Sequence, residues 1–251
     1  GVDVLAEEVL CEYYFKNPAD KSNRKYTYEK MLSAYNKAVL QRNNILYDAL
    51  FHSELTGVLE AFEDRIATAG AYIISQRKKY IEALMSYAPD IYRGLSGDTE
   101  DIGIEYKCGC GEGSYEELLD ALRLNRAEDT KTSTTGVGPH RDDFSFNVKR
   151  KDGILLDVRK YGSQGQQRTS ALSLKLSEIE LVKKSIQDTP VLLLDDVLSE
   201  LDSNRQNYLL NNICDTQTII TCTGLDEFVR NRFQINRVFE VIRGQVFEKS
   251  V

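Results

Sequence analysis

Two short stretches in the second half of this 251-residue chain carry the residue types of a phosphate site. The first, YGSQGQQRT (161–169), places a serine, two glycines and three glutamines where an amphipathic helix begins. A helix start needs only one capping residue, so the extra polar groups form either a solvent-facing loop or an anion site. Ser163 can donate its hydroxyl, and Gly165 lets backbone N–H groups approach a ligand closely. The positive end of the helix dipole would also favour a phosphate.

The second stretch, VLLLDDVLSELD (191–202), reads as a buried strand that ends in two carboxylates. Its continuous apolar run predicts a strand covered on both faces. Asp195 and Asp196 then stand at the carboxyl end, which is the edge where open α/β sheets bind ligands. Adjacent acids at such a place suit Mg²⁺ held together with a nucleotide phosphate. The alternative is a strand that has simply reached solvent and begins a turn.

The elements around these stretches predict an α/β fold. A helix is expected over about 166–185, with apolar residues at helical spacing. A helix over about 203–213 separates the strand at 191–195 from a second apolar strand, QTIITCT (217–223), and RVFEVIRGQVFE (237–248) is expected to close the sheet. Alternating helices and strands of this kind indicate a parallel or mixed sheet.

The first half of the chain is predicted to be mainly helical. Apolar spacing indicates two long helices, over 29–50 and about 55–88, joined by a short turn near 51–55 and packed as an antiparallel pair. Pro89 should end the second helix. A short helix over about 114–129 and a flexible polar stretch, TKTSTTG (130–136), are expected next.

The alternating pattern over 142–160 then predicts a β-hairpin. The cysteine pair in KCGCGEG (107–113) has no second pair with which to complete a zinc site, so we expect it to form a turn between short strands.

Composition narrows the class of protein. The net charge of −7 argues against a basic footprint over the whole chain, although QRKKY (76–80) and VKRKDG (148–153) could be either solvated faces or phosphate contacts. No apolar run reaches the roughly 18 to 20 residues of a membrane span, and the first residues lack a secretory signal. We therefore expect a cytoplasmic protein that does not associate with membranes.

Several motifs together resemble one family. In chain order these are NKAVLQRNNIL (36–46), GPHRDD (138–143), YGSQGQQRT and LLLDDVLSELD (192–202). They are similar to the RecF family, in the SMC-like branch of the ABC ATPases, from about residue 25 to the end. The resemblance implies an ABC-ATPase-like α/β sheet with signature helix, Walker B strand and D-loop, together with a helical arm. The expected parts are an unassigned segment (1–28), an arm or lobe II-like domain (29–135) and a head segment (136–251).

The resemblance also implies site roles. Ser163, Gly165 and Gln166 of the signature loop would contact the γ-phosphate of ATP bound on a second subunit. Asp195 would position Mg²⁺, and Asp196 stands where related ATPases carry the acid that activates water. The resemblance thus implies ATP and Mg²⁺ as cofactors of the intact protein.

Partners follow from the same resemblance. Asp202 of the D-loop would lie at an ATP-dependent homodimer interface, and double-stranded or junction DNA and a RecR-type partner would bind. The implied activity is recombination mediation in DNA repair and replication, through recognition of gapped DNA and help in loading the recombinase. For Arg141, within GPHRDD, we favour a structural ion pair over a DNA contact.

The chain departs from the family pattern in two places. No GxxxxGK[ST] loop occurs in the sequence, so we expect the chain to begin after the lobe that carries this loop, and to be inactive alone. Thr221, Cys222 and Thr223 occupy the region where many ABC ATPases place a γ-phosphate-sensing histidine.

Two alternatives to a RecF-type protein stay open. The chain could be a head segment of another SMC-like ATPase, or a non-catalytic DNA- or protein-binding module.

Overall fold

The computed structural model describes residues 28–97, 100–150, 153–186, 188–223 and 235–249. They fall into two compact units, one that ends at Asp188 and one that begins at Thr189. This division differs from the boundary near residue 135 that the motifs predict between arm and head, which stays a prediction. Among the described residues, no helix is both long and apolar enough to cross a membrane.

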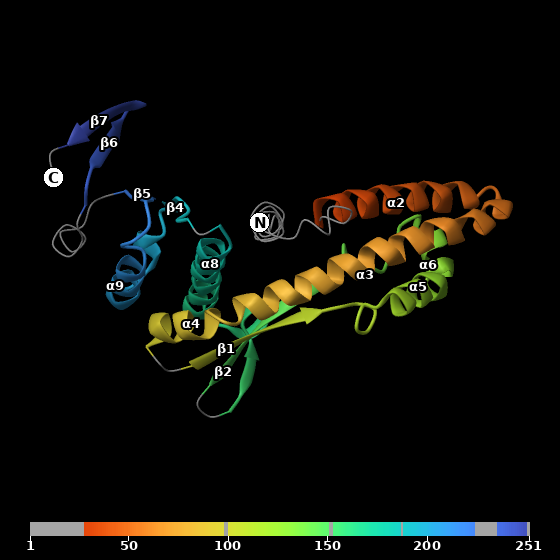
Figure 1. Ribbon diagram of the computed structural model, residues 1–251, viewed down its shortest axis with the longest axis horizontal. Coiled ribbons are helices and arrows are strands. Elements are labelled where there is room, and N and C mark those ends of the chain that lie inside the picture. The colour runs from red at the N-terminus through yellow and green to blue at the C-terminus, as the bar shows by residue number, and fades with distance from the viewer. Residues whose placement is uncertain (1–27, 98–99, 151–152, 187, 224–234, 250–251) are drawn as a thin grey trace. The chain divides into compact units, whose positions relative to one another are not determined.

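The first unit is a helical arm joined to a small antiparallel sheet (Figure 1). Its elements are α2 (Tyr28–Ala49), η3 (Ser53–Val58), α3 (Leu59–Leu84), α4 (Ala88–Ser96), β1 (Glu100–Lys107), α5 (Tyr115–Leu124), α6 (Arg126–Thr132), β2 (Asp143–Arg150), β3 (Leu155–Asp157), α7 (Val158–Tyr161) and α8 (Gln164–Ile186).

The arm is the predicted antiparallel pair, in which α2 lies along α3 (Figure 1). Its core combines aromatic and small side chains of α2 and α3 with leucines of α5, including Tyr35, Ile73 and Leu118. Gly70 allows this close approach, because a Cβ atom there would stand 2.5 Å from Cδ2 of Leu118. The arm is therefore held by side-chain packing along its length.

A buried network of charges ties α2 to α3 and α6. Arg42 is fully buried, and its guanidinium donates to Glu63 at 3.1 Å and to Asp129 at 2.6 Å. Arg126 adds a second pairing to Glu63, and Arg42 also donates to the hydroxyl of Thr135. Two cations thus face two carboxylates, which offsets the cost of removing these charges from water.

The sheet of the first unit has the strand order β1-β2-β3. Strands β1 and β2 pair over their whole length, with Ile102 opposite Val148. These two residues pack with Tyr92 of α4 and Val158 of α7. Helix α8 packs against both α3 and α4 (Figure 1). Its Leu174 and Leu181 share a core cluster with Tyr80 and Leu84 of α3, against which Ile104 and Phe146 of the sheet also pack.

The second unit contains β4 (Leu192–Asp195), η4 (Leu198–Glu200), α9 (Ser203–Asn212), β5 (Thr218–Thr221), β6 (Val238–Ile242) and β7 (Gln245–Lys249). Strands β4 and β5 are parallel, and β6 pairs with β7 as an antiparallel hairpin. Helix α9 connects the two parallel strands, as the alternation of elements predicted.

Two predictions about this unit differ from the structure. In the described residues, β6 and β7 pair with each other and do not close the β4–β5 sheet. Leu193 is 69% exposed, so the described residues of the second unit do not cover β4 on both faces. An apolar run shows that a strand can be buried, but the covering layer is a property of the tertiary structure.

Local predictions in the first unit were wrong at three places. Pro89 lies in the first turn of α4, where its missing N–H costs nothing, and α3 already ends at Leu84. The stretch 130–136 is anchored: Thr135 is fully buried and both its N–H and its hydroxyl bond Asn43. The cysteine turn leads from β1 into α5, not from strand to strand.

Candidate phosphate and metal site

The first candidate site is the start of α8 in the first unit, where Ser163 and Gln166 form a reciprocal cap. The Ser163 hydroxyl oxygen accepts from the N–H of Gln166 at 3.2 Å, and the Gln166 side-chain oxygen accepts from the N–H of Ser163 at 2.9 Å. This is the capping box of a Ser-x-x-Gln sequence, and it explains why the helix begins at Gln164, two residues earlier than predicted.

The capping box leaves other hydrogen-bond donors at the helix start that can bind an anion. Ser163 is exposed and its oxygen accepts a bond, so its own O–H stays available. The backbone N–H groups of Gln164 and Gly165 have no acceptor among the described residues, as expected in a first helical turn. A hydroxyl and two N–H groups at the positive end of a 23-residue helix can bind a phosphate.

The Gln166 side chain is already engaged within the unit. Besides its bond to Ser163, its Nε2 donates to Oε1 of Glu100 on β1 at 2.7 Å. The other oxygen of Glu100 accepts from the hydroxyl of Tyr92 on α4 at 2.9 Å. A phosphate contact by the Gln166 side chain could therefore use only its second Nε2 hydrogen.

The second candidate site is the end of the β4–β5 pair in the second unit. Asp195 is the last residue of β4 and pairs with Thr221 on β5. The Thr221 hydroxyl donates to Oδ1 of Asp195, and the N–H of Asp196 donates to the same hydroxyl at 3.1 Å. Asp196 is exposed and has a left-handed backbone with φ of 52°, which turns the chain sharply out of the strand.

These residues fit a magnesium ion that is shared with a nucleotide. Asp195 and Asp196 are exposed neighbours in the chain, and the Thr221 hydroxyl bonds the first of the two carboxylates. Mg²⁺ in nucleotide sites uses one or two carboxylates plus phosphate oxygens and waters. Oδ2 of Asp195 has no partner among the described residues. No group of three His, Cys, Asp or Glu residues within metal-binding reach occurs in the described parts of the chain, so a complete protein cage is not formed there.

Asp202 has a structural task at the start of α9. Its Oδ1 accepts from the N–H groups of Asn204 and Arg205, and its Oδ2 pairs with the Arg205 side chain at 2.8 Å. An aspartate at this position caps the helix. A role at a dimer interface would come in addition to the cap.

The motif GPHRDD (138–143) mostly makes structural contacts within the first unit. Gly138 has φ of 124° and lies against the hydroxyl of Tyr35, where a Cβ atom would stand at 2.3 Å. His140 bonds that hydroxyl at 2.6 Å and the carbonyl of Thr135 at 3.0 Å. Burial lowers the pKa of His140, so the neutral ring is favoured.

Arg141 differs from its neighbours in this motif. Its side chain is exposed and has no acidic partner among the described residues; its one contact is a 3.5 Å bond from Nε to the carbonyl of Thr135. The described residues contain no ion pair of Arg141, so the structural ion pair that we expected stays a prediction. The adjacent Asp142 instead accepts from Tyr106 and from the N–H of Gly109.

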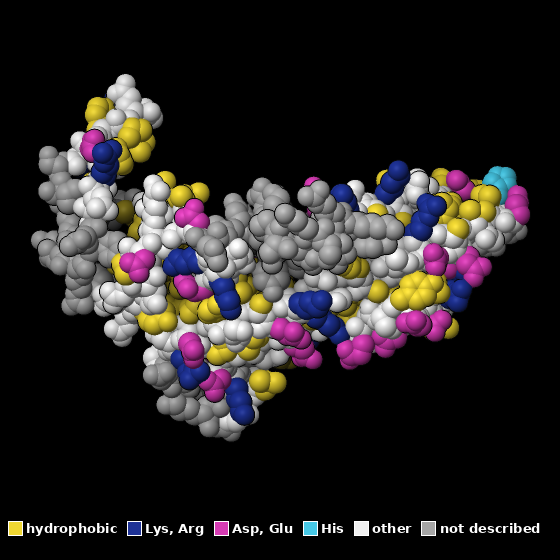
Figure 2. Space-filling view, viewed as in Figure 1, with side chains coloured by type: hydrophobic (Ala, Val, Ile, Leu, Met, Phe, Trp, Pro, Cys, Tyr) yellow, Lys and Arg dark blue, Asp and Glu magenta, His cyan; other side chains and the backbone are white. Residues whose placement is uncertain are grey.

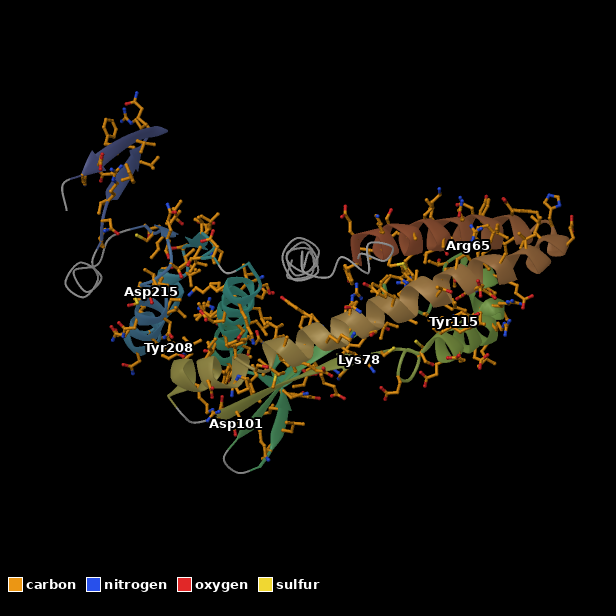
Figure 3. The ribbon with its side chains drawn as sticks, in the orientation of Figure 1. Arg65, Lys78, Asp101, Tyr115, Tyr208 and Asp215 are labelled. Atoms are coloured by element: carbon orange, nitrogen blue, oxygen red, sulfur yellow. The ribbon has the colours of Figure 1, made fainter. Side chains whose placement is uncertain are left out.

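Most of the basic side chains in the run 76–80 already bond to groups of the first unit. Arg77 donates to the hydroxyl of Tyr28 and to the carbonyl of Pro139. Lys78, labelled in Figure 3, pairs with Glu112 at 2.6 Å. Of this run, only Lys79 is an exposed cation without a described partner, so the segment makes a poor phosphate-binding surface.

The cysteine pair also lacks the features of a metal site. Cys108 and Cys110 are free thiols with their sulfur atoms 3.4 Å apart. Burial raises the pKa of Cys110 to about 12, and the pKa of Cys108 is raised for the same reason. Both thiols are thus protonated and poor nucleophiles at neutral pH.

Comparisons with known proteins agree with the motifs. The chain is 53% identical over 220 residues to the DNA replication and repair protein RecF of Agathobacter rectalis, and 49% identical over 225 residues to that of Lachnospira eligens. These matches cover 87% and 89% of the chain. The chain belongs to the RecF family. It spans 58% and 60% of the length of these two relatives.

A solved RecF structure confirms the fold. The recombination mediator protein RecF of the RecFOR pathway, solved as RecF-ATPrS and as RecF-ATP, matches with a TM-score of 0.75 in both forms. The identities are 35% and 33%, over 89% of this chain and 59% and 58% of the solved ones. The predicted α/β fold with a helical arm is thereby confirmed. No protein-family model matches the chain.

Reasoning from the sequence missed two features of the predicted RecF-type site: the capping box between Ser163 and Gln166, and the contact with Glu100. The Ser-x-x-Gln spacing at 163–166 is a local signal for a capping box and could have been found. Glu100 carries no such signal, because it lies 66 positions from Gln166 and meets it only through the packing of β1 against α8.

Proposed function

We propose that this chain provides the signature loop, the Walker B carboxylates and the D-loop of a RecF-type ATPase. The intact protein would be an ATP-dependent, DNA-binding dimer that acts in recombination and repair. It would recognise gapped or junction DNA, cooperate with a RecR-type partner and help to load the recombinase. Membership of the RecF family supports this proposal, as do the geometry at the start of α8 and the geometry at the end of β4.

The proposal rests mainly on the hydrogen-bond donors at the start of α8 that have no acceptor among the described residues. The O–H of Ser163 and the N–H groups of Gln164 and Gly165 would bind the γ-phosphate of ATP held by a second subunit. Such donors stabilise the phosphate charge without rearrangement, because the capping box already fixes their positions.

The carboxylates of the second unit would act on nucleotide held by the rest of the ATPase. Asp195 would bind the magnesium ion, whose chemistry is to neutralise phosphate charge, and Thr221 fixes this carboxylate through its hydroxyl. Asp196 would orient the attacking water, and Asp202 would contact the second subunit from its capped position. Each of these roles uses an exposed side chain.

The chain should bind ATP poorly by itself, because it has no Walker A lysine or hydroxyl to hold the phosphates. Isothermal titration calorimetry of ATP with Mg²⁺ should therefore show no tight binding. Micromolar or tighter affinity would contradict this part of the proposal.

A mixing experiment tests the trans role of Ser163. The chain is added to an ATP-loaded RecF relative that has an intact Walker A loop, and association is followed by analytical ultracentrifugation with ATP or ADP. Association should require ATP and should be lost in Ser163→Arg, because the larger side chain occupies the phosphate position.

The matched control is Ser75→Arg, which changes an exposed serine on α3 in the same way. It should associate as the unchanged chain does, and circular dichroism should show that both variants are folded. Equal association of Ser163→Arg and the unchanged chain would refute the assignment of this loop.

A further inference from the structure

The side chain of Glu100 decides which way the amide of Gln166 points. A glutamine amide has an oxygen and a nitrogen of nearly equal size, so its orientation is fixed only by its hydrogen-bond partners. Glu100 offers an acceptor at 2.7 Å, which draws Nε2 toward β1. Oε1 is then turned to the N–H of Ser163, where it completes the capping box.

Glu100 is itself held from the opposite side. Its second oxygen accepts from the hydroxyl of Tyr92 at 2.9 Å, and Tyr92 is fully buried in the core between α4 and the sheet. The carboxylate therefore has one partner on α4 and one on α8. Hydrogen bonds to an ionised acceptor are stronger than those between neutral groups, which favours a fixed geometry here.

A second contact joins α8 to the arm further along the helix. The hydroxyl of Tyr80 on α3 donates to Glu178 on α8 at 3.0 Å, and both side chains are buried. Helix α8 is thus hydrogen-bonded to α3 at Glu178. At its start it is bonded through Gln166 to Glu100, which also bonds Tyr92 of α4. The start of α8 cannot turn without breaking one of these contacts.

We propose that Glu100 is a positioning residue for the signature loop. By orienting the Gln166 amide it keeps Oε1 bonded to the N–H of Ser163, which holds Ser163 in the cap. In this position the Ser163 hydroxyl accepts from the N–H of Gln166 and leaves its O–H proton for an anion, and through Tyr92 this state is linked to α4. The inference rests on the proposed function for the phosphate-binding role of Ser163, whereas the positioning of Gln166 can be measured without nucleotide.

The first test uses the chain alone. Amide hydrogen exchange at Ser163 and Gln166, followed by NMR, should accelerate roughly tenfold in Glu100→Ala, as expected for the loss of one charge-assisted hydrogen bond. Glu105→Ala removes an exposed carboxylate from the same strand and should leave these two amides unchanged. Unchanged exchange in Glu100→Ala would overturn the proposal.

Glu100→Gln covers the case in which Glu100→Ala does not fold. Its amide keeps the side-chain volume and can accept from Gln166 in only one of its two orientations. Exchange at Ser163 and Gln166 should therefore lie between the values of the unchanged chain and of a chain that lacks the bond. Exchange equal to that of the unchanged chain, with Glu100→Ala unfolded, would count against an orienting role.

The second test separates positioning from the proposed function. In the mixing experiment with an ATP-loaded relative, Glu100→Ala should weaken association several-fold, while ATP binding by the relative stays the same. If Ser163→Arg abolishes association and Glu100→Ala does not change it, the positioning role is refuted. If neither variant changes association while exchange accelerates in Glu100→Ala, the trans role of the loop fails and the orientation of Gln166 by Glu100 stands.

Discussion

The hydroxyl of Thr221 joins the two acidic residues at the end of β4: it donates to Oδ1 of Asp195 and accepts from the N–H of Asp196. The two strands that carry these residues are 26 positions apart in sequence and meet as a parallel pair. Thr221, which lies in the region where many ABC ATPases place a sensing histidine, thus fixes the first carboxylate.

Removal of this hydroxyl should loosen the end of the strand pair. Thr221→Val keeps the β-branched shape and loses both hydrogen bonds, so we expect the free energy of unfolding of the second unit to fall by about 1 kcal/mol. Thr221→Ser keeps the hydroxyl and should lose less. Hydrogen exchange of the Leu194 and Ile220 amides measures this loss of stability. Equal exchange rates in the unchanged chain and in both variants would contradict the two hydrogen bonds assigned to the Thr221 hydroxyl.

The buried charges of the arm should be among its most sensitive positions. Arg42→Met leaves Glu63 and Asp129 without their common cation, which should cost about 3 to 5 kcal/mol. Burial opposes ionisation of Glu63, yet its pKa is lowered overall by Arg126 and Arg42. Urea unfolding followed by circular dichroism measures the loss. A Lys37→Met control removes an exposed cation from the same helix and should change stability little.

Two glycines of the arm offer a matched comparison. Gly70→Ala places a Cβ atom against Leu118 and should destabilise the first unit by about 1 to 3 kcal/mol. Gly57→Ala adds the same atom where nothing stands within 4 Å, so its effect should be small. Thermal unfolding of both variants tests the packing of α3 against α5, and equal melting temperatures would argue against it.

His140 should make the first unit sensitive to mild acid. Burial is the main reason that its pKa is lowered, with the neighbouring Arg141 adding to the effect. Below about pH 6.5 the unfolded chain therefore binds more protons at this residue than the folded chain does. The free energy of unfolding should fall as the pH drops from about 6.5 toward the lower folded pKa.

His140→Gln provides the comparison, because glutamine does not titrate. Urea unfolding at pH 7.5 and at pH 5 should show a larger loss for the unchanged chain than for the variant. Carboxylates such as Glu63 and Asp143, whose pKa values are lowered, lose stabilisation in acid in both proteins and cancel in the difference. An equal loss in both would show that His140 does not titrate in this range.

Asp202 allows its capping role to be separated from its proposed role at the interface. Asp202→Ala should destabilise α9 by about 1 kcal/mol, whereas Asp202→Asn retains a capping oxygen. Hydrogen exchange of the Arg205 amide reports on the cap. If Asp202→Asn keeps the cap and still weakens ATP-dependent association, the carboxylate has a separate role between subunits.

Local sequence signals predicted most elements of the fold. The apolar spacing of α2 and α3, the hairpin of β2 and β3, and the β4–α9–β5 succession are all periodic patterns that a chain carries in its own order. Strand β1 was missed although Ile102, Ile104 and Tyr106 recur at every second position, a pattern typical of a strand. It pairs with β2 along eight residues.

The sequence by itself determined the chemistry that is available: Ser163 and Gly165 at a helix start, Asp195 and Asp196 at a strand end, and the RecF-type order of these motifs. Only the tertiary structure decided how those groups are used. Glu100 orients Gln166, Thr221 fixes Asp195, and the Arg141 side chain bonds the carbonyl of Thr135. The physical reason is that hydrogen bonds between distant segments depend on packing, and a local pattern contains no information about which distant residue arrives.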